Sequence, residues 1–331
     1  LYGYTDMPAD FWPTVTRWIA DHHQWNVDSE WMRFIPGIVK GIGFVVNVFC
    51  KPDEKVIIQP PVYHPFRLTP LGNKRQVVMN PLIMNEDGSY SMDFEGLAKV
   101  ADEKCRVLIL ANPHNPAGIV WDVDTLRRLA DFCSERGIIV ISDEIHCDMA
   151  HKGFKHHPFA SVSERAAQCS ITFGAPSKTF NIAGIVSSYC VVPNEELRRP
   201  FFEWLDANEL SEPTIFSPIA TIAAFQNGEE WRQQMLEYVE ANIDFVDNFL
   251  KTRIPQIKAL RPQASFLIWL NCRDLNLDPL NRLFIDGARL ALNDGEMFGE
   301  EGRGFMRMNI ASPRAVLQDA MERLEQAVKA L

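Results

Sequence analysis

The sequence has no cysteine pair of the CxxC type, although it contains seven cysteines. They are scattered along the chain, and several lie inside apolar runs such as residues 188–192. An odd number of scattered cysteines argues against a disulfide framework and favours reduced cysteines in a protein core. We therefore expect a cytoplasmic protein.

Long hydrophobic runs are also missing. The longest apolar stretches, around residues 41–50 and 266–270, are far too short to span a bilayer, and no charged-then-apolar leader is present. The chain contains no internal repeat and no low-complexity segment. These observations argue against a membrane protein and against a repeat architecture.

The sequence also lacks clusters of positive charge. Lysine and arginine total 33 against 43 acidic residues, and the net charge of −10 is spread without long runs of one sign. Nucleic-acid binding normally needs a clustered basic face, so we expect no nucleic-acid partner. The 331 residues, 47% of them hydrophobic, can bury a large core and suggest about two domains.

What the sequence does contain is a repeated order of apolar strand, turn and helix. Continuous apolar strands that alternate with helices indicate an α/β fold with a mainly parallel sheet covered on both faces. Helices are expected at 38–49 and 124–136. The expected strands are 56–59, 106–110, 138–141, 171–173 and 187–192.

The pattern changes after about residue 210. A helical region is expected at 218–253, with Trp231, Met235, Tyr238 and Val239 at the spacing of a buried stripe. Strands at 266–270 and 304–310 and a closing helix at 313–330 complete a smaller α+β unit. We place the domain boundary near residue 230, which gives a large domain, 1–230, and a small C-terminal domain, 231–331.

Four polar or aromatic residues follow directly after four of the predicted strands of the large sheet: Tyr63, Asn115, Asp143 and Lys178. Ligands of open parallel sheets bind outside the carboxyl ends of the strands. One pocket can therefore gather these residues, although they span over a hundred positions.

The four residues are those that pyridoxal 5'-phosphate (PLP) would require. PLP catalysis needs an amine for the aldehyde, a carboxylate near the pyridine nitrogen, a donor to the ring hydroxyl, a stacking face and a phosphate cradle. Lys178 supplies the amine, although a lysine after a serine is more often an exposed loop residue. Asp143 supplies the carboxylate, with a helix-capping or ion-paired aspartate as the alternative.

The remaining parts of such a site also have candidates. Asn115 can donate to the ring oxygen, or it can form an Asx turn before the following proline. Tyr63 can stack on the ring, or it can pack on a neighbouring proline. Gly37, Ile38 and Val39, at the start of an apolar helix, can offer backbone N–H groups to a phosphate, although a plain helix cap is the simpler interpretation.

Five co-linear motifs resemble those of the fold type I PLP-dependent enzymes, and within them the cystathionine β-lyase-like C–S lyases of the class I/II aminotransferase superfamily. The resemblance extends over essentially the whole chain, and the motifs occur in the same order. They are PPVYHPF at 60–66, NPHNPAG at 112–118, SDEIH at 142–146, APSKTFNIAG at 175–184 and GEEGRGFMR at 299–307.

This resemblance implies a large domain with a mainly parallel sheet of the seven-stranded type and a smaller C-terminal α+β domain. It implies catalytic roles for Lys178, Asp143 and Tyr63, with Lys178 holding the cofactor aldehyde and Asp143 on the pyridine nitrogen. Asn115, with His146 close to it, lies on the ring hydroxyl.

The resemblance also assigns the substrate contacts. Arg307, together with Asn115, binds the substrate, with the guanidinium on the α-carboxylate. Tyr4 matches a tyrosine that reaches the phosphate of the neighbouring subunit in relatives, which implies a homodimer with shared active sites.

The phosphate end departs from the family pattern. Many relatives have serine three residues before the lysine and, in the aspartate aminotransferase branch, arginine eight residues after it, whereas this chain has Ala175 and Val186. The phosphate is then expected to depend on backbone amides, on Ser177 and on Tyr4 of a partner subunit.

The function that the resemblance implies is α,β-elimination. The expected enzyme is a PLP-dependent lyase that cleaves cystathionine or related cysteine thioethers to a thiol, pyruvate and ammonia. A class I/II aminotransferase is the first alternative, because the same scaffold supports both reactions, and a PLP-fold regulatory or binding protein is the second.

Two other classes of site have weaker support. A dinucleotide fold would need a third glycine where Val46 stands, in a segment that is expected to be helical. A zinc site at His151, His156 and His157 lacks paired cysteines, and we expect no metal.

Overall fold

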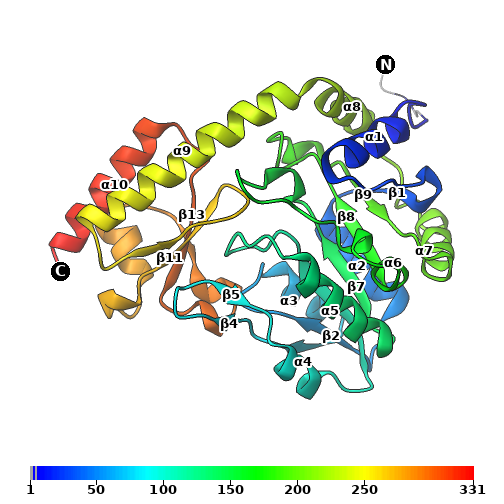
Figure 1. Cartoon of the computed structure of the whole chain (residues 1–331), viewed down its shortest axis with the longest axis horizontal. Coiled ribbons are helices and arrows are strands. Elements are labelled where there is room, and N and C mark those ends of the chain that lie inside the picture. Colours follow the sequence, from blue (N-terminus) through cyan, green and yellow to red (C-terminus); the bar gives the residue numbers. More distant parts are fainter. Residues whose placement is uncertain (1–2, 4–5) are drawn as a thin grey trace.

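A seven-stranded sheet forms the centre of the larger part of the molecule (Figure 1). The structure is a computed structural model that describes Gly3 and residues 6–331. The sheet order is β1-β9-β8-β7-β6-β2-β3. Its strands are β1 (Met32–Ile35), β2 (Lys55–Ile58), β3 (Gln76–Met79), β6 (Cys105–Ala111), β7 (Ile139–Asp143), β8 (Ser170–Gly174) and β9 (Ser188–Val191).

The middle of this sheet is parallel, as the sequence predicts. Strands β3, β2, β6, β7 and β8 pair in parallel, whereas β9 runs antiparallel to both of its neighbours. Every residue of β7 and β8 is buried, which explains their continuous apolar character. The expected α/β fold with a mainly parallel sheet covered on both faces is confirmed.

Helices cover both faces of the large sheet. One apolar core packs α2 (Ile38–Phe49), α3 (Pro65–Gly72) and α7 (Glu195–Ala207) against it. A second core lies on the other face with α4 (Phe94–Val100), α5 (Val123–Glu135) and α6 (Glu164–Gln168). A third cluster joins α1 (Phe11–His23) to α8 (Phe216–Asn227) beside β1 and β9.

A four-stranded antiparallel sheet forms the smaller part, on the left of Figure 1. It packs with α9 (Glu229–Arg253) and α10 (Arg314–Lys329) around its own apolar core. Its strands, in spatial order, are β10 (Lys258–Leu260), β11 (Leu267–Asn271), β13 (Phe305–Asn309) and β12 (Asn293–Asp294). A separate hairpin of β4 (Ile83–Met84) and β5 (Tyr90–Ser91) lies beside the large sheet.

The predicted helical region at 218–253 consists of two helices, α8 and α9. It breaks at Gly228, where a Cβ atom would come within 2.4 Å of the Ala224 carbonyl oxygen and of the Phe180 ring. The predicted buried stripe is wrong in part, because Trp231 and Tyr238 are 46% and 48% exposed. The buried face of α9 begins at Val239 and continues along the C-terminal half of the helix.

In the part of the chain that the structure describes, no helix combines the length and the apolar character needed to cross a membrane.

Candidate active site

A cavity of about 550 Å³ lies at the carboxyl ends of the central strands. All of the predicted site residues line it except Tyr4, which falls outside the described residues. They are Gly37, Ile38, Val39, Tyr63, Asn115, Asp143, His146, Ser177, Lys178 and Arg307. The volume is in the range of ordinary small-molecule sites.

The sheet explains why distant residues meet here. Strands β6, β7 and β8 are neighbours and run in the same direction, so the segments after them emerge at one edge. Asp143 is the last residue of β7, while Asn115 and Lys178 each lie four residues beyond the ends of β6 and β8. The Lys178 loop is closed by a hydrogen bond from the Ile182 N–H to the Ser177 carbonyl oxygen.

Asp143 is buried and has little local compensation for a negative charge. Burial raises the pKa of its carboxyl to about 7, helped by the neighbouring Glu144 and opposed by the Ile145 N–H and by Lys178. The Ile145 N–H donates to Oδ1 at 3.1 Å. A protonated pyridine nitrogen would give this carboxylate the cationic partner that the protein itself supplies only weakly. Asp143 therefore fits the PLP ring.

Glu144 holds the strand end behind Asp143 in place, a role that the sequence did not reveal. Its Oε1 accepts hydrogen bonds from the Ser142 hydroxyl and the Phe159 N–H, both at 2.8 Å, and its Oε2 pairs with His156 at 2.9 Å. The alternation of a strand sends Asp143 and Glu144 in opposite directions. One carboxylate thus faces the cavity while the next is saturated by protein donors.

Two of the three histidines considered for zinc have other partners. His156 pairs with Glu144, and His151 pairs with the Ser265 carbonyl oxygen at 2.7 Å.

His146 is a neutral imidazole at the wall of the cavity. Burial lowers its pKa to about 3, and the charges of Lys178 and Arg307 act in the same direction. Its Nδ1 is buried and has no hydrogen-bond partner among the described residues. A neutral ring with a free nitrogen can bond to a bound ligand without adding charge to the site.

Arg307 reaches the cavity from β13 of the small sheet. It donates to Asn115 Oδ1 at 2.9 Å and to Asn293 Oδ1 at 2.7 Å, and its guanidinium carbon lies 4.8 Å from the centre of the Phe298 ring. Burial lowers its pKa, and Nε has no partner. An arginine stays charged in proteins, so this partly satisfied cation is suited to a carboxylate.

The prediction for Gly37 needs a correction. Its N–H donates to the Ile35 carbonyl oxygen and to Ser188 Oγ, both at 2.9 Å, so it is already used. Gly37 instead caps α2 with a φ of +105°, a conformation that favours glycine. The first turn of a helix leaves N–H groups free, which makes Ile38 and Val39 the better donors for a phosphate.

Lys40 was missed by the sequence analysis. It follows Val39 in the same turn of α2, and it lines the cavity. Ser177 also lines the cavity, together with Ala175 and Val186. Lys40 thus offers a positive charge at the end of the cavity where the family's usual phosphate side chains are missing.

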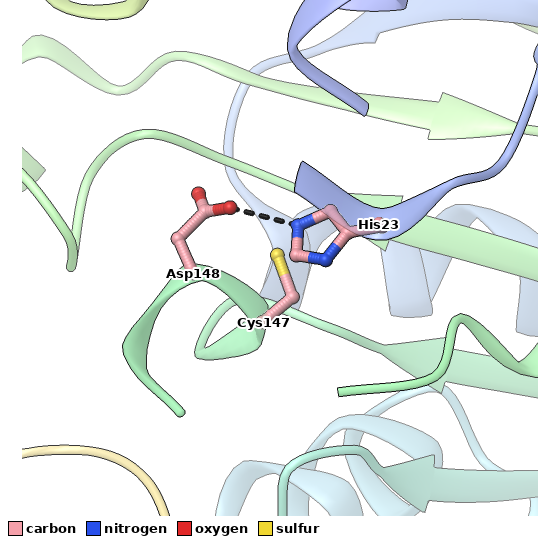
Figure 2. A group of neighbouring side chains, drawn as sticks. All are labelled: His23, Cys147 and Asp148. Atoms are coloured by element: carbon pink, nitrogen blue, oxygen red, sulfur yellow. Dashed lines mark hydrogen bonds and ion pairs between the residues drawn. The ribbon is translucent and has the colours of Figure 1, made fainter. Parts of the chain in front are cut away.

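His23, Cys147 and Asp148 form a polar cluster (Figure 2). Asp148 Oδ1 pairs with His23 Nε2 at 2.8 Å and accepts from Trp18 Nε1 at 3.0 Å. Burial pushes the pKa of Asp148 up, but the hydrogen bond from His23 and its charge outweigh burial and hold it below the usual range. Asp148 is therefore ionised and satisfied by protein donors.

The same cluster reaches the segment that carries Lys178. Thr179 Oγ1 donates to Asp148 Oδ2 at 3.4 Å, and Arg232 of α9 donates to the Asp148 carbonyl oxygen at 2.9 Å. Burial, with Asp148 beside it, raises the pKa of the Cys147 thiol well above its usual value, so the thiol stays protonated. The cluster is best described as a hydrogen-bonded support that ties α1 and α9 to the residue next to Lys178.

This fold and this cavity define a PLP-dependent enzyme of fold type I. The chain belongs to the family described as aminotransferase class I and II, whose model matches residues 1–324.

Individual relatives extend the likeness over nearly the whole chain. The chain is 38% identical to cystathionine beta-lyase PatB of Bacillus subtilis over 331 residues, covering 99% of this chain and 85% of PatB. It is 31% identical to protein MalY of Escherichia coli over 335 residues, covering 100% of this chain and 85% of MalY. Cystalysin from Treponema denticola, whose crystal structure contains PLP, is 33% identical with a TM-score of 0.96, covering 100% of this chain and 84% of that chain.

Proposed function

We propose that the protein is a C–S β-lyase that cleaves cystathionine or a related cysteine thioether. The observation that carries the proposal is the single cavity in which Lys178, Asp143 and Arg307 meet. The likeness to the cystathionine beta-lyase PatB supports elimination as the reaction.

When bound, PLP supplies an aldehyde that joins to amines and a ring that withdraws electrons from the Cα of the joined amino acid. Asp143 would hold a proton at the pyridine nitrogen, Asn115 would donate to the ring hydroxyl and Tyr63 would cover the ring face. The first turn of α2, with Ser177 and Lys40, would bind the phosphate. These residues fit the parts of the cofactor from one end to the other.

The substrate is handled by two further groups. Arg307 would bind the α-carboxylate and so fix the orientation of the Cα–H bond. The Lys178 amine would take the Cα proton as general base. The C–S bond then breaks, with its electron pair leaving on sulfur, and addition of water gives one thiol, one pyruvate and one ammonia per thioether.

Transamination is the second candidate, because the family name and the shared scaffold favour it. The two reactions start with the same proton transfer to Lys178. They differ afterwards, since transamination needs a 2-oxo acid as a second substrate and releases no thiol. A purely regulatory or binding role is the third candidate, and the complete set of Lys178, Asp143 and Arg307 argues against it.

Turnover separates these candidates. The purified protein with PLP is incubated with L-cystathionine, with and without a 2-oxo acid, while thiol, pyruvate and ammonia are measured. We expect all three products without the 2-oxo acid. Consumption of amino acid that depends on the 2-oxo acid and releases no thiol would establish the aminotransferase instead, and no turnover under either condition would favour the binding role.

We also propose a homodimer with shared active sites, in which Tyr4 reaches the phosphate of the neighbouring site. The non-polar Ala175 and Val186 in the cavity wall support it, because they leave the phosphate short of side-chain donors. If Tyr4→Phe and Lys178→Ala subunits are each impaired, mixing them should restore activity at one of the two hybrid sites. A monomer in analytical ultracentrifugation would contradict the proposal.

The division into domains at 1–230 and 231–331 is likewise proposed, supported by the separate apolar core around the small sheet. A cytoplasmic location is proposed from the cysteines, since all seven are free and buried.

A further inference from the structure

The positive charge of Arg307 is not neutralised by any carboxylate in the described part of the chain. Burial lowers the pKa of its guanidinium, and the group that opposes burial is Tyr63 rather than an acidic side chain. Among the described residues that line the cavity, Asp143 is the only carboxylate, whereas Lys40, Lys178 and Arg307 are all cations. The cavity therefore has an excess of positive charge, and Arg307 lies in it without a counter-ion.

Two amide oxygens hold the Arg307 guanidinium in place. Nη1 donates to Asn115 Oδ1 at 2.9 Å, and Nη2 donates to Asn293 Oδ1 at 2.7 Å. An arginine has more N–H donors than these two bonds use, and Nε is buried without a partner among the described residues. The guanidinium is thus fixed by neutral acceptors, while its charge and its remaining donors stay available to a ligand.

The small sheet places Asn293 beside this guanidinium. Asn293 of β12 lies directly opposite Arg307 of β13 in the antiparallel register, and both residues line the cavity. Because an arginine can only donate hydrogen bonds, the amide oxygen has to face Nη2. The amide nitrogen donates to the sulfur of Met297 at 3.9 Å, which is a weak acceptor. An aspartate has nearly the same shape, so the neutrality of the asparagine is the property that matters at this position.

We propose that Asn293 is a positioning residue for the substrate carboxylate. It fixes Arg307 through an uncharged oxygen, so the guanidinium is oriented before the substrate binds and has no counter-ion that the substrate must displace. A carboxylate in place of this amide would orient Arg307 as well, but it would compete with the substrate for the positive charge. The inference rests on the proposed function only in taking the ligand of Arg307 to be a carboxylate, which lyase and aminotransferase substrates share.

The test uses a carboxylate that occupies the site without reacting. β-Methylthiopropionate has the carboxylate and the thioether of an S-alkyl cysteine, but it has no amino group to join to PLP. Its neutral amide, β-methylthiopropionamide, lacks the negative charge. The dissociation constants of both compounds are measured by isothermal titration calorimetry with the PLP-loaded protein. The midpoint of thermal unfolding is measured with the PLP-free protein.

Asn293→Asp should have opposite effects on stability and on binding. The new carboxylate neutralises a buried cation, so the unfolding midpoint of the PLP-free protein should rise by about 2 °C. The same carboxylate competes with the ligand, so the dissociation constant of β-methylthiopropionate should rise by about 10-fold or more. The dissociation constant of the amide should stay within about twofold of the parent value, because the amide has no charge to lose. A purely structural asparagine would not combine higher stability with weaker binding of the acid alone.

Asn293→Ala separates orientation from charge. It removes the acceptor of Nη2 without adding a carboxylate, so the unfolding midpoint should fall, and the acid should bind about 5-fold more weakly. Asn248→Asp is the matched control, because this exposed residue of α9 does not line the cavity and should leave both dissociation constants unchanged. With L-cystathionine, both Asn293 variants should change KM more than kcat, since the carboxylate is held before and during the reaction.

Three results would overturn the role of Asn293. The first is an Asn293→Asp protein that binds the acid within about twofold of the parent. The second is a lower unfolding midpoint in Asn293→Asp, which would show that the Arg307 charge already has a counter-ion. The third is a parent protein that binds the acid no better than the amide. Failure of the parent to release thiol from L-cystathionine would overturn the lyase function alone, because the binding and stability measurements do not depend on turnover.

Discussion

Arg307 Nη1 donates a 2.9 Å hydrogen bond to Asn115 Oδ1, which joins β13 of the small sheet to the loop after β6 of the large sheet. The bond fixes the amide of Asn115, because its oxygen is occupied and its Nδ2 is left to donate. The residue proposed to hold the substrate thereby orients the residue proposed to contact the cofactor ring. Both parts of the fold are needed to assemble this pair.

Replacing Asp143 by asparagine should separate cofactor binding from catalysis. Asparagine keeps the shape of the side chain, but it cannot hold a proton on the pyridine nitrogen by charge. We expect the variant to bind PLP and to turn over at least ~100-fold more slowly, which corresponds to about 3 kcal/mol in the activation barrier. Near-normal kcat with full PLP content would contradict the role of Asp143.

The raised pKa of Asp143 also predicts a pH effect on the protein without PLP. The pKa of the Asp143 carboxyl is about 7 in the folded protein, whereas an ordinary aspartate has a pKa of 3.8. The folded state therefore binds the proton more tightly than the unfolded state does. The free energy of unfolding should therefore fall as pH rises from about 4 to about 7. Between pH 5 and pH 8 the parent should lose about 2 to 3 kcal/mol more than Asp143→Asn, as measured by denaturant unfolding.

Equal losses in the two PLP-free proteins would show that Asp143 is ionised throughout this range. With PLP bound, the positive ring nitrogen should favour the carboxylate and reduce the difference between parent and variant.

The cluster around Asp148 should contribute strongly to stability. Asp148→Ala removes the acceptor of Trp18 Nε1 and the partner of His23 inside the protein. We expect the free energy of unfolding to fall by about 3 kcal/mol, since two buried polar groups lose their partner. Asp21→Ala, at an exposed position on α1, is the control and should change it by less than about 0.5 kcal/mol. A similar small change in both variants would refute the structural role.

Replacing either of two glycines of α2 by alanine should change the stability of the protein, but in opposite directions. A Cβ at Gly41 would lie 2.7 Å from the Phe173 ring, and overpacking of this kind costs about 1 to 3 kcal/mol. A Cβ at Gly43 would meet Thr69 at 3.4 Å, an ordinary contact. Gly41→Ala should therefore destabilise the protein, whereas Gly43→Ala should stabilise it by up to about 1 kcal/mol through helix propensity. Denaturant unfolding of both variants checks the signs, and stabilisation by Gly41→Ala would be contrary to the packing.

The sequence predicts the central strands and α2 well because their signals are local. Apolar runs at β6, β7 and β8 are bounded by turns, and Ile38–Phe49 is apolar at most of its positions. The edge strand β3 was missed for a physical reason. β3 is exposed or half-buried at every position, so it has no continuous apolar run, and its place depends on pairing with β2.

The site was predicted where a residue type and a strand end coincide, as at Asp143 and Lys178. It was not predicted where the role depends on an unrelated segment. Asn293 accepts a hydrogen bond from Arg307 of the neighbouring strand. The N–H of Gly37 donates to Ser188, which lies 151 positions away in the sequence. Neither relationship has a signature in the local sequence, because each arises only from the folded arrangement.

The central claim is that the cavity holds PLP on Lys178, and borohydride trapping tests it most directly. The PLP-loaded protein is reduced with borohydride and digested, and the modified peptide is identified by mass spectrometry. We expect one modified residue, Lys178, and loss of the trapped absorbance in Lys178→Ala. A label on Lys40, which lines the same cavity, or on any other lysine would contradict the assignment.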